Sequence, residues 1–181
     1  MNDTTLTLKL ERAISELRRG GKLIVSDINT GTCVLLVASE LIEKETIQEL
    51  SEKSLSRPSI ILSSNRSNAI GINVKNQPSS ILINKNWSIN DILSLCMPLY
   101  GYEKPLINGV ILESNKSIIS SCLLILRQAR LLPAGLMSII SNVKIENINQ
   151  WAFKNDLLHV ETNDIQSYET SNTDNLTMSV K

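Results

Sequence analysis

The side chains that could carry chemistry are scattered along this chain rather than gathered in one motif. His159 is the only histidine, and it lies in an apolar run, Leu157 to Val160, that is typical of a strand. A lone histidine in a strand is more often a packed side chain than a metal ligand or a general base. The three cysteines are too widely spaced for a zinc site, and each has apolar neighbours. We therefore expect Cys33, Cys96 and Cys122 to be reduced, packed thiols, as is usual in the cytosol.

Carboxylates are most frequent in one segment, where they are typical of a solvated helix face. The acidic residues of this segment stand among lysines, in the set Glu43, Lys44, Glu45, Glu49, Glu52 and Lys53. Opposite charges at these spacings support an exposed helix rather than a catalytic carboxylate pair. We therefore expect a solvated helix face in this segment rather than a metal site.

Other motifs of catalysis or phosphate binding are missing from the sequence. Neither a Walker-type nor a dinucleotide-binding glycine motif can be written, and no serine–histidine–acid arrangement is specific enough to predict a nucleophile. A helix beginning at Ser117, beside Asn115 and Lys116, could hold an anion through its free N–H groups. An ordinary capped helix start is the simpler interpretation of that segment.

Composition is that of a globular protein about one domain long. The 181 residues include 18 Lys and Arg and 18 Asp and Glu, so the formal net charge is zero, and aromatic residues make up only 3%. Without a basic cluster, a nucleic-acid-binding surface is not expected. The N-terminus lacks the apolar core of a signal peptide. No run approaches the ~18 apolar residues of a membrane-spanning helix.

Apolar periodicity predicts that helices and strands alternate along most of the chain. The predicted helices cover residues 10–17, 44–53, 88–96, 117–130, 145–153 and 162–168. The predicted strands cover residues 22–26, 33–38, 59–62, 80–83, 109–112 and 157–160, with one more after Gly135. The composition of residues 27–32 predicts a turn, and that of residues 98–105 predicts a loop. This alternation indicates a layered α/β domain.

One segment resembles part of a known enzyme family. The run SIISSCLLILRQARLLPAGLMSII, from Ser117 to Ile140, predicts a buried helix followed by a short strand. It resembles the substrate-binding helix and the next strand of 3,4-dihydroxy-2-butanone 4-phosphate synthase, an enzyme of riboflavin biosynthesis. The runs ERAISELRRGGKLIVSD and ENINQWAFKNDLLHVETNDIQSYE are similar to the opening and closing elements of that family. The resemblance covers Glu11 to Tyr168 and implies the family's layered mixed sheet with helices.

The positions that carry catalytic groups in that family hold other residues in this chain. The family's helix opens with Gly-His-Thr and its strand carries a glutamate, where this chain has Ser117, Ile118, Ile119 and Ile139. The family's acidic loop, Arg-Glu-Asn-Glu-Gly-Asp, corresponds to the run DINTGT, in which only Asp27 keeps a carboxylate. Magnesium prefers oxygen ligands, and proton transfer needs titratable side chains. We therefore expect no catalytic, cofactor-binding or metal-binding residue.

The resemblance implies a structural role for this chain. The segment RQARLLPAGL looks most like the degenerate synthase-like half of some bacterial GTP cyclohydrolase II proteins. It implies a cytoplasmic homodimer that supports a cyclohydrolase domain in cis or in trans. Magnesium belongs to the active synthases and zinc to the cyclohydrolase, so neither is expected here. Residues 1–169 would form the synthase-like domain, and the polar residues 170–181 a tail or linker towards a cyclohydrolase domain.

Two other functions stay open from the sequence. The chain could be an active enzyme of the same fold, acting on ribulose 5-phosphate or a related sugar phosphate through relocated residues such as Asp27, Glu40 and His159. It could instead be a sugar-phosphate sensor that keeps phosphate binding at the helix start near Ser117. Saturable binding of ribulose 5-phosphate would distinguish the sensor from a scaffold.

Overall fold

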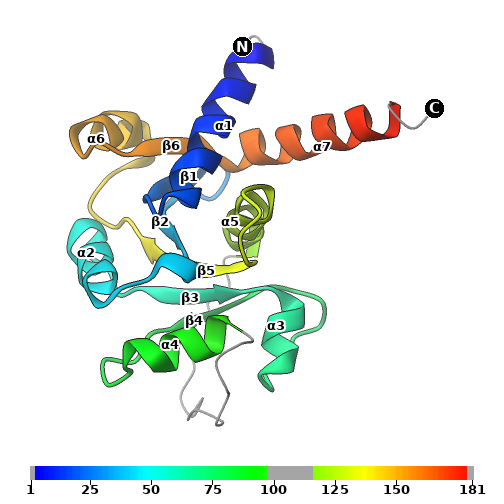
Figure 1. The fold of residues 1–181 in the computed structure, drawn as a ribbon. Helices are drawn as coiled ribbons and strands as arrows, with labels where there is room; N and C mark the ends of the chain where they lie inside the picture. Colours follow the sequence, from blue (N-terminus) through cyan, green and yellow to red (C-terminus); the bar gives the residue numbers. More distant parts are fainter. Residues whose placement is uncertain (1–2, 98–115, 179–181) are drawn as a thin grey trace.

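The computed structural model describes residues 3–97 and 116–178, which form one mixed sheet with helices on both faces (Figure 1). The elements in chain order are α1 (Asp3–Arg18), β1 (Leu23–Asp27), β2 (Thr32–Ala38), η1 (Ser39–Leu41), α2 (Lys44–Ser54), β3 (Ser59–Leu62), α3 (Ser64–Ala69), β4 (Ser79–Leu82), α4 (Ile89–Cys96), α5 (Lys116–Gln128), β5 (Ala134–Ile139), η2 (Ile145–Asn147), α6 (Ile148–Lys154), β6 (Leu158–Glu161) and α7 (Thr162–Met178).

The sheet has six strands among the described residues, in the order β4-β3-β5-β2-β1-β6. All neighbouring strands are antiparallel except β1 and β6, which run parallel. Strands β1 and β2 form a hairpin in which Asp27 lies opposite Thr32. Strand β5 pairs with both β2 and β3 and therefore joins the two halves of the sheet. The predicted layered α/β fold with a mixed sheet is confirmed.

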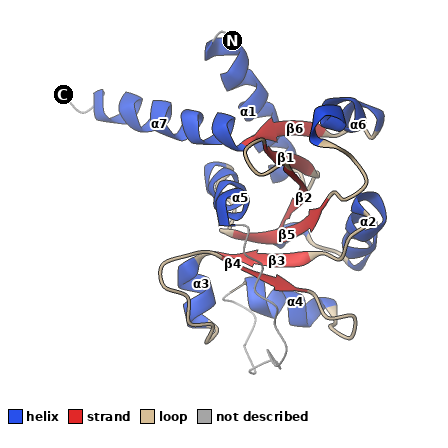
Figure 2. Cartoon of the chain, turned by 180° about the vertical axis from the view of Figure 1, so that it is seen from behind, coloured by secondary structure: helices blue, strands red, loops and turns tan. Residues whose placement is uncertain are grey.

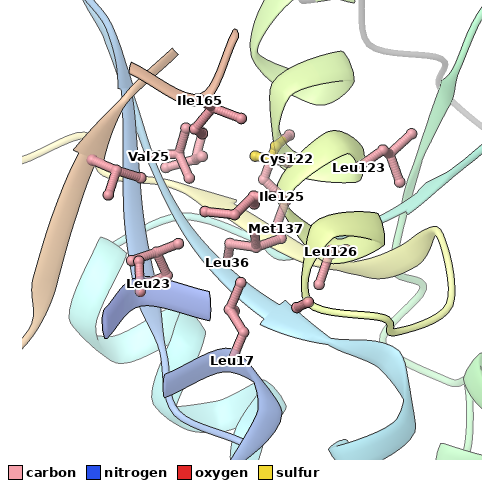
Figure 3. Close-up of a cluster of buried hydrophobic side chains, with 14 of the residues drawn as sticks. Leu17, Leu23, Val25, Leu36, Cys122, Leu123, Ile125, Leu126, Met137 and Ile165 are labelled. Atoms are coloured by element: carbon pink, nitrogen blue, oxygen red, sulfur yellow. The ribbon is translucent and has the colours of Figure 1, made fainter. Parts of the chain in front are cut away.

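Alternating side chains of the strands build two separate hydrophobic cores. Helices α1, α5 and α7 cover one face, and helices α2, α4 and α6 cover the other (Figure 2). In Figure 3, Cys122 and Ile125 of α5 point towards the strand residues Leu36 and Met137. The cores are almost entirely aliphatic, in keeping with the low aromatic content. Both faces of the central strands are buried, which explains their continuous apolar runs.

Local signals set several helix boundaries where the sequence predicts them. Ser88 caps α4, because its Oγ accepts a hydrogen bond from Asp91 N while the Asp91 carboxylate accepts one from Ser88 N. Helix α1 ends at Arg18, and Gly20 follows it with a φ of +83°, the left-handed conformation that favours glycine. The predicted turn over residues 27–32 is present between β1 and β2.

The structure differs from the sequence-based expectations at four places. Helix α1 begins at Asp3, earlier than the apolar spacing from Leu10 indicates. Helix α7 extends to Met178, so residues 170–178, expected as a polar tail, are helical. That run contains neither glycine nor proline, and extending a helix whose first turns are packed costs little. The polar residues after β3 form α3, which Ser63 caps. The helix expected over 145–153 begins as the separate turn η2. The predicted loop at 98–105 and strand at 109–112 lie outside the described residues.

Within residues 3–97 and 116–178, no helix has both the length and the apolar character needed to cross a membrane.

Gly135 allows β5 to lie close to its neighbours, and its replacement should be costly. A Cβ atom at this position would lie 2.6 Å from Val37 O and 3.2 Å from Leu126 Cδ1. We expect Gly135→Ala to lower the free energy of unfolding by about 1–3 kcal/mol, measured by urea denaturation. Gly21→Ala is the matched control, because the nearest atoms that its Cβ would meet belong to the flexible side chain of Glu16 rather than to backbone. Equal, small effects of both changes would contradict the close approach.

Candidate functional site

The positions that the resemblance matches to the synthases' catalytic groups lie at one end of the sheet. Strand β1 ends there at Asp27, opposite the start of β2. Strand β5 ends there too, since Ile139 pairs with Val34 and Ile140 N donates to Cys33 O at 2.8 Å. The topology therefore places Asp27 and Ile139 at the same end of the sheet.

Isoleucine side chains fill this candidate site on the face of the sheet that α5 covers. Ile118 and Ile119, in the first turn of α5, are both 0% exposed. They belong to the same hydrophobic cluster, against which the partly buried Ile139 also packs. The three isoleucines of the family's catalytic positions thus form part of the core. Alkyl groups at these places can neither bind a cation nor transfer a proton.

Asp27 organises the hairpin between β1 and β2. Its side chain is 1% exposed, and its Oδ1 accepts a hydrogen bond from Asn29 N at 3.0 Å. This is the local turn geometry that aspartate commonly stabilises. The carboxylate expected to survive from the acidic loop therefore bonds to the turn that follows it.

Glu40 lies at the opposite end of β2 from Asp27. It belongs to η1, which follows the last residue of β2. Its Oε1 accepts a hydrogen bond from Leu132 N at 2.6 Å, which ties η1 to the connection between α5 and β5. The structure therefore does not bring Asp27 and Glu40 into one pocket, as the active-enzyme alternative would require of them.

His159 joins two polar partners that the sequence did not indicate. Its Nε2 lies 2.7 Å from Ser26 Oγ, and its Nδ1 lies 2.6 Å from Asn149 Oδ1. Since an amide oxygen only accepts, Nδ1–H donates to Asn149, and Nε2 accepts from the Ser26 hydroxyl. This order of groups is that of a nucleophile, its base and an orienting residue. Ser26 is only 1% exposed, however, so the chain Ser26–His159–Asn149 acts as a link between β1, β6 and α6.

The surroundings of His159 favour its neutral form. Burial lowers the pKa of His159 to about 4, and the positive charge of Lys9 lowers it further, while Asp164 opposes both effects. At neutral pH the imidazole is therefore uncharged. No feature of the sequence links Ser26 or Asn149 to this histidine, because strand register and the position of α6 bring them together.

The described residues do not fit a magnesium site. Among residues 3–97 and 116–178, no group of three or more His, Cys, Asp or Glu side chains could hold a metal ion. The carboxylate of Asp27 is engaged in its turn, and Ile139 stands where the family's strand carries glutamate. The three cysteines are buried and free, and burial raises the pKa of Cys33 to about 11 and that of Cys96 to about 12.

The single histidine allows its state to be measured directly. In proton NMR of the whole chain, we expect the His159 ring signals to titrate near pH 4. Because the pKa of His159 in the folded chain is below the usual histidine value of about 6.5, the unfolded chain binds the proton first as pH falls. Folding stability contributed by His159 should therefore be complete above about pH 6.5 and fall towards pH 4. His159→Gln should flatten this part of the pH–stability curve, whereas titration near pH 6.5 would contradict the burial of the ring.

Restoring the family's histidine should destabilise the core. We expect Ile118→His to lower the free energy of unfolding by about 3–5 kcal/mol at pH 8, because a buried imidazole replaces a packed alkyl side chain. Leu8→His is the control, since Leu8 of α1 is half exposed and the change should cost less than about 1 kcal/mol. Urea denaturation measures both. Similar small losses would mean that the helix start retains room for a polar group.

Comparison with known proteins identifies the fold. No protein-family model matches the chain, and no curated protein matches it. Among solved structures, the 3,4-dihydroxy-2-butanone 4-phosphate synthase of Candida albicans is similar, with a TM-score of 0.68, 18% identity, and coverage of 88% of this chain and 96% of that chain. The two-domain synthase RibBX of A. baumannii has a TM-score of 0.68 and 13% identity, with 88% of this chain and 57% of that chain covered.

A third similar structure is a 3,4-dihydroxy-2-butanone 4-phosphate synthase in a cation-free form. Its TM-score is 0.69 at 11% identity, with coverage of 90% of this chain and 97% of that chain. Sequence identities this low support a shared fold but do not show a shared activity. The chain therefore has the fold of 3,4-dihydroxy-2-butanone 4-phosphate synthase.

Proposed function

We propose that this chain is a catalytically degenerate synthase-like domain with a structural role in riboflavin biosynthesis. The observation that carries the proposal is the full burial of Ile118 and Ile119 in the core, at the helix start where the family has its histidine and threonine. The packing of Ile139 against the same core supports it. A site lined in this way offers neither cation ligands nor proton-transfer groups.

The structural role that we infer is dimerisation and support of a GTP cyclohydrolase II domain. The two-domain RibBX, of which this chain covers 57%, supports the idea that this fold can work beside a second domain. In this proposal the domain acts in the cytoplasm through its surface. The magnesium of the active synthases has no role in it, and zinc belongs to the cyclohydrolase partner.

Formate release tests the loss of catalysis. Purified chain 1–181 is incubated with ribulose 5-phosphate and saturating magnesium, beside an authentic synthase at equal concentration. We expect formate release no greater than in the enzyme-free control, because hydrocarbon occupies the catalytic positions. Magnesium-dependent turnover would overturn the proposal and favour an enzyme with relocated residues. In that case His159→Gln and Asp27→Asn would show whether either residue takes part.

Self-association tests the structural role. Analytical ultracentrifugation should give a mass twice the 20.1 kDa of the chain, and a separate cyclohydrolase II domain should sediment with it. A monomer that binds no cyclohydrolase domain would contradict the structural role. Only the loss of catalysis would then remain of the proposed function.

A further inference from the structure

A groove is lined by residues of α2 and of the segment that joins β4 to α4. Helices α2 and α4 lie on the face of the sheet opposite α5 (Figure 1). Its volume of about 480 Å³ is in the range of small-molecule sites. None of the residues of the candidate site lines it. We call it the α2–α4 groove.

The floor of the α2–α4 groove is apolar. It includes Ile47, Pro58, Ile83 and Ile92, of which Ile92 is completely buried. Trp87 adds the only aromatic ring among the lining residues and is half-buried. An indole beside an aliphatic floor favours a ligand with a planar ring, because such a ring stacks favourably on an aromatic face.

The rim of the groove is positively charged. Lys44 and Lys85 are exposed at its mouth, and Arg57 lines it as well. The Nε atom of Arg57 donates to Ile83 O at 2.6 Å, which fixes the guanidinium at the groove before any ligand binds. Glu52 is the one carboxylate in the lining, so three cations and one anion leave a net charge of +2. This balance favours a dianion.

The opposing carboxylate is itself engaged. Glu52 Oε1 accepts a hydrogen bond from Gln48 Nε2 at 2.8 Å, one turn earlier on α2. Because this partner is neutral, Glu52 keeps its charge, and the net charge of the lining remains +2. Guanidinium and ammonium groups together are the usual protein partners of phosphate.

We propose that the α2–α4 groove binds a nucleoside monophosphate or a similar planar aromatic phosphate. The base lies against Trp87 and the aliphatic floor, and the phosphate is bound by Lys44, Arg57 and Lys85. This site is independent of the proposed loss of catalysis, because it lies on the other face of the sheet. A domain without synthase activity could therefore still bind a nucleotide in this groove.

Fluorescence of Trp87 tests the proposal. The chain has two tryptophans, so Trp151→Phe leaves Trp87 as the only emitter. Titration with AMP, GMP, CMP and UMP should quench this emission saturably, with a dissociation constant below about 1 mM for at least one nucleotide. The matching nucleoside and inorganic phosphate, each alone, should bind at least about tenfold more weakly. Isothermal titration calorimetry of the unaltered chain checks the result without the Trp151 change.

Charge variants locate the phosphate. Lys44→Gln with Lys85→Gln should weaken binding at least about tenfold, and Glu52→Gln should strengthen it about twofold. The matched control is Lys75→Gln with Lys154→Gln, which removes two exposed lysines outside the groove and should change binding less than about twofold. No saturable signal up to about 10 mM of any nucleotide would overturn the proposal. Equal losses in the two lysine pairs would also overturn it.

Discussion

Packing of α5 against the middle of the sheet is the interaction on which the rest of this structure depends. Its apolar face contributes seven buried residues, of which six are hydrophobic, and they meet side chains from β1, β2 and β5 as well as from α1 and α7. Polar contacts then fix its C-terminal end. Arg18 Nε donates to Ala129 O at 2.8 Å, Glu40 accepts from Leu132 N, and Gln128 Nε2 donates to Glu169 at 2.9 Å. Helix α5 is thereby fixed by hydrophobic burial along its length and by hydrogen bonds at one end.

This packing also explains why the candidate site and the core are the same place. In the family that the fold resembles, the start of this helix serves the substrate. Here the apolar face continues into the first turn, so Ile118 and Ile119 extend the core to the end of the sheet where the catalytic groups would stand. The opposite face, with α2 and α4, has its own hydrophobic cluster. The α2–α4 groove therefore lies apart from the isoleucines at the start of α5.

The sequence predicted the fold well where local patterns decide it. The strands at 33–38 and 59–62 and the helix capped by Ser88 follow from apolar runs and a capping signal, and the structure contains them. The end of α7 was missed because nothing local stops a helix in a polar run without glycine or proline.

The hydrogen-bonded chain Ser26–His159–Asn149 could not be predicted, since it depends on the parallel register of β1 and β6 and on where α6 lies. Burial of Ile118 and Ile119 was predictable from their apolar neighbours, whereas the grouping of Trp87 with Lys44 and Arg57 depends on tertiary contacts.

The complete burial of Ile118 and Ile119 also bears on how this sequence can evolve. Proteins have a stability reserve of about 5–15 kcal/mol, and a polar group in a packed core consumes a large share of it. A single substitution of either isoleucine by a polar side chain would therefore need compensating changes among the residues that surround it. The effects of such neighbouring substitutions are not additive, so their order would matter. The start of α5 thus limits which sequences can be reached from this one by single stable steps.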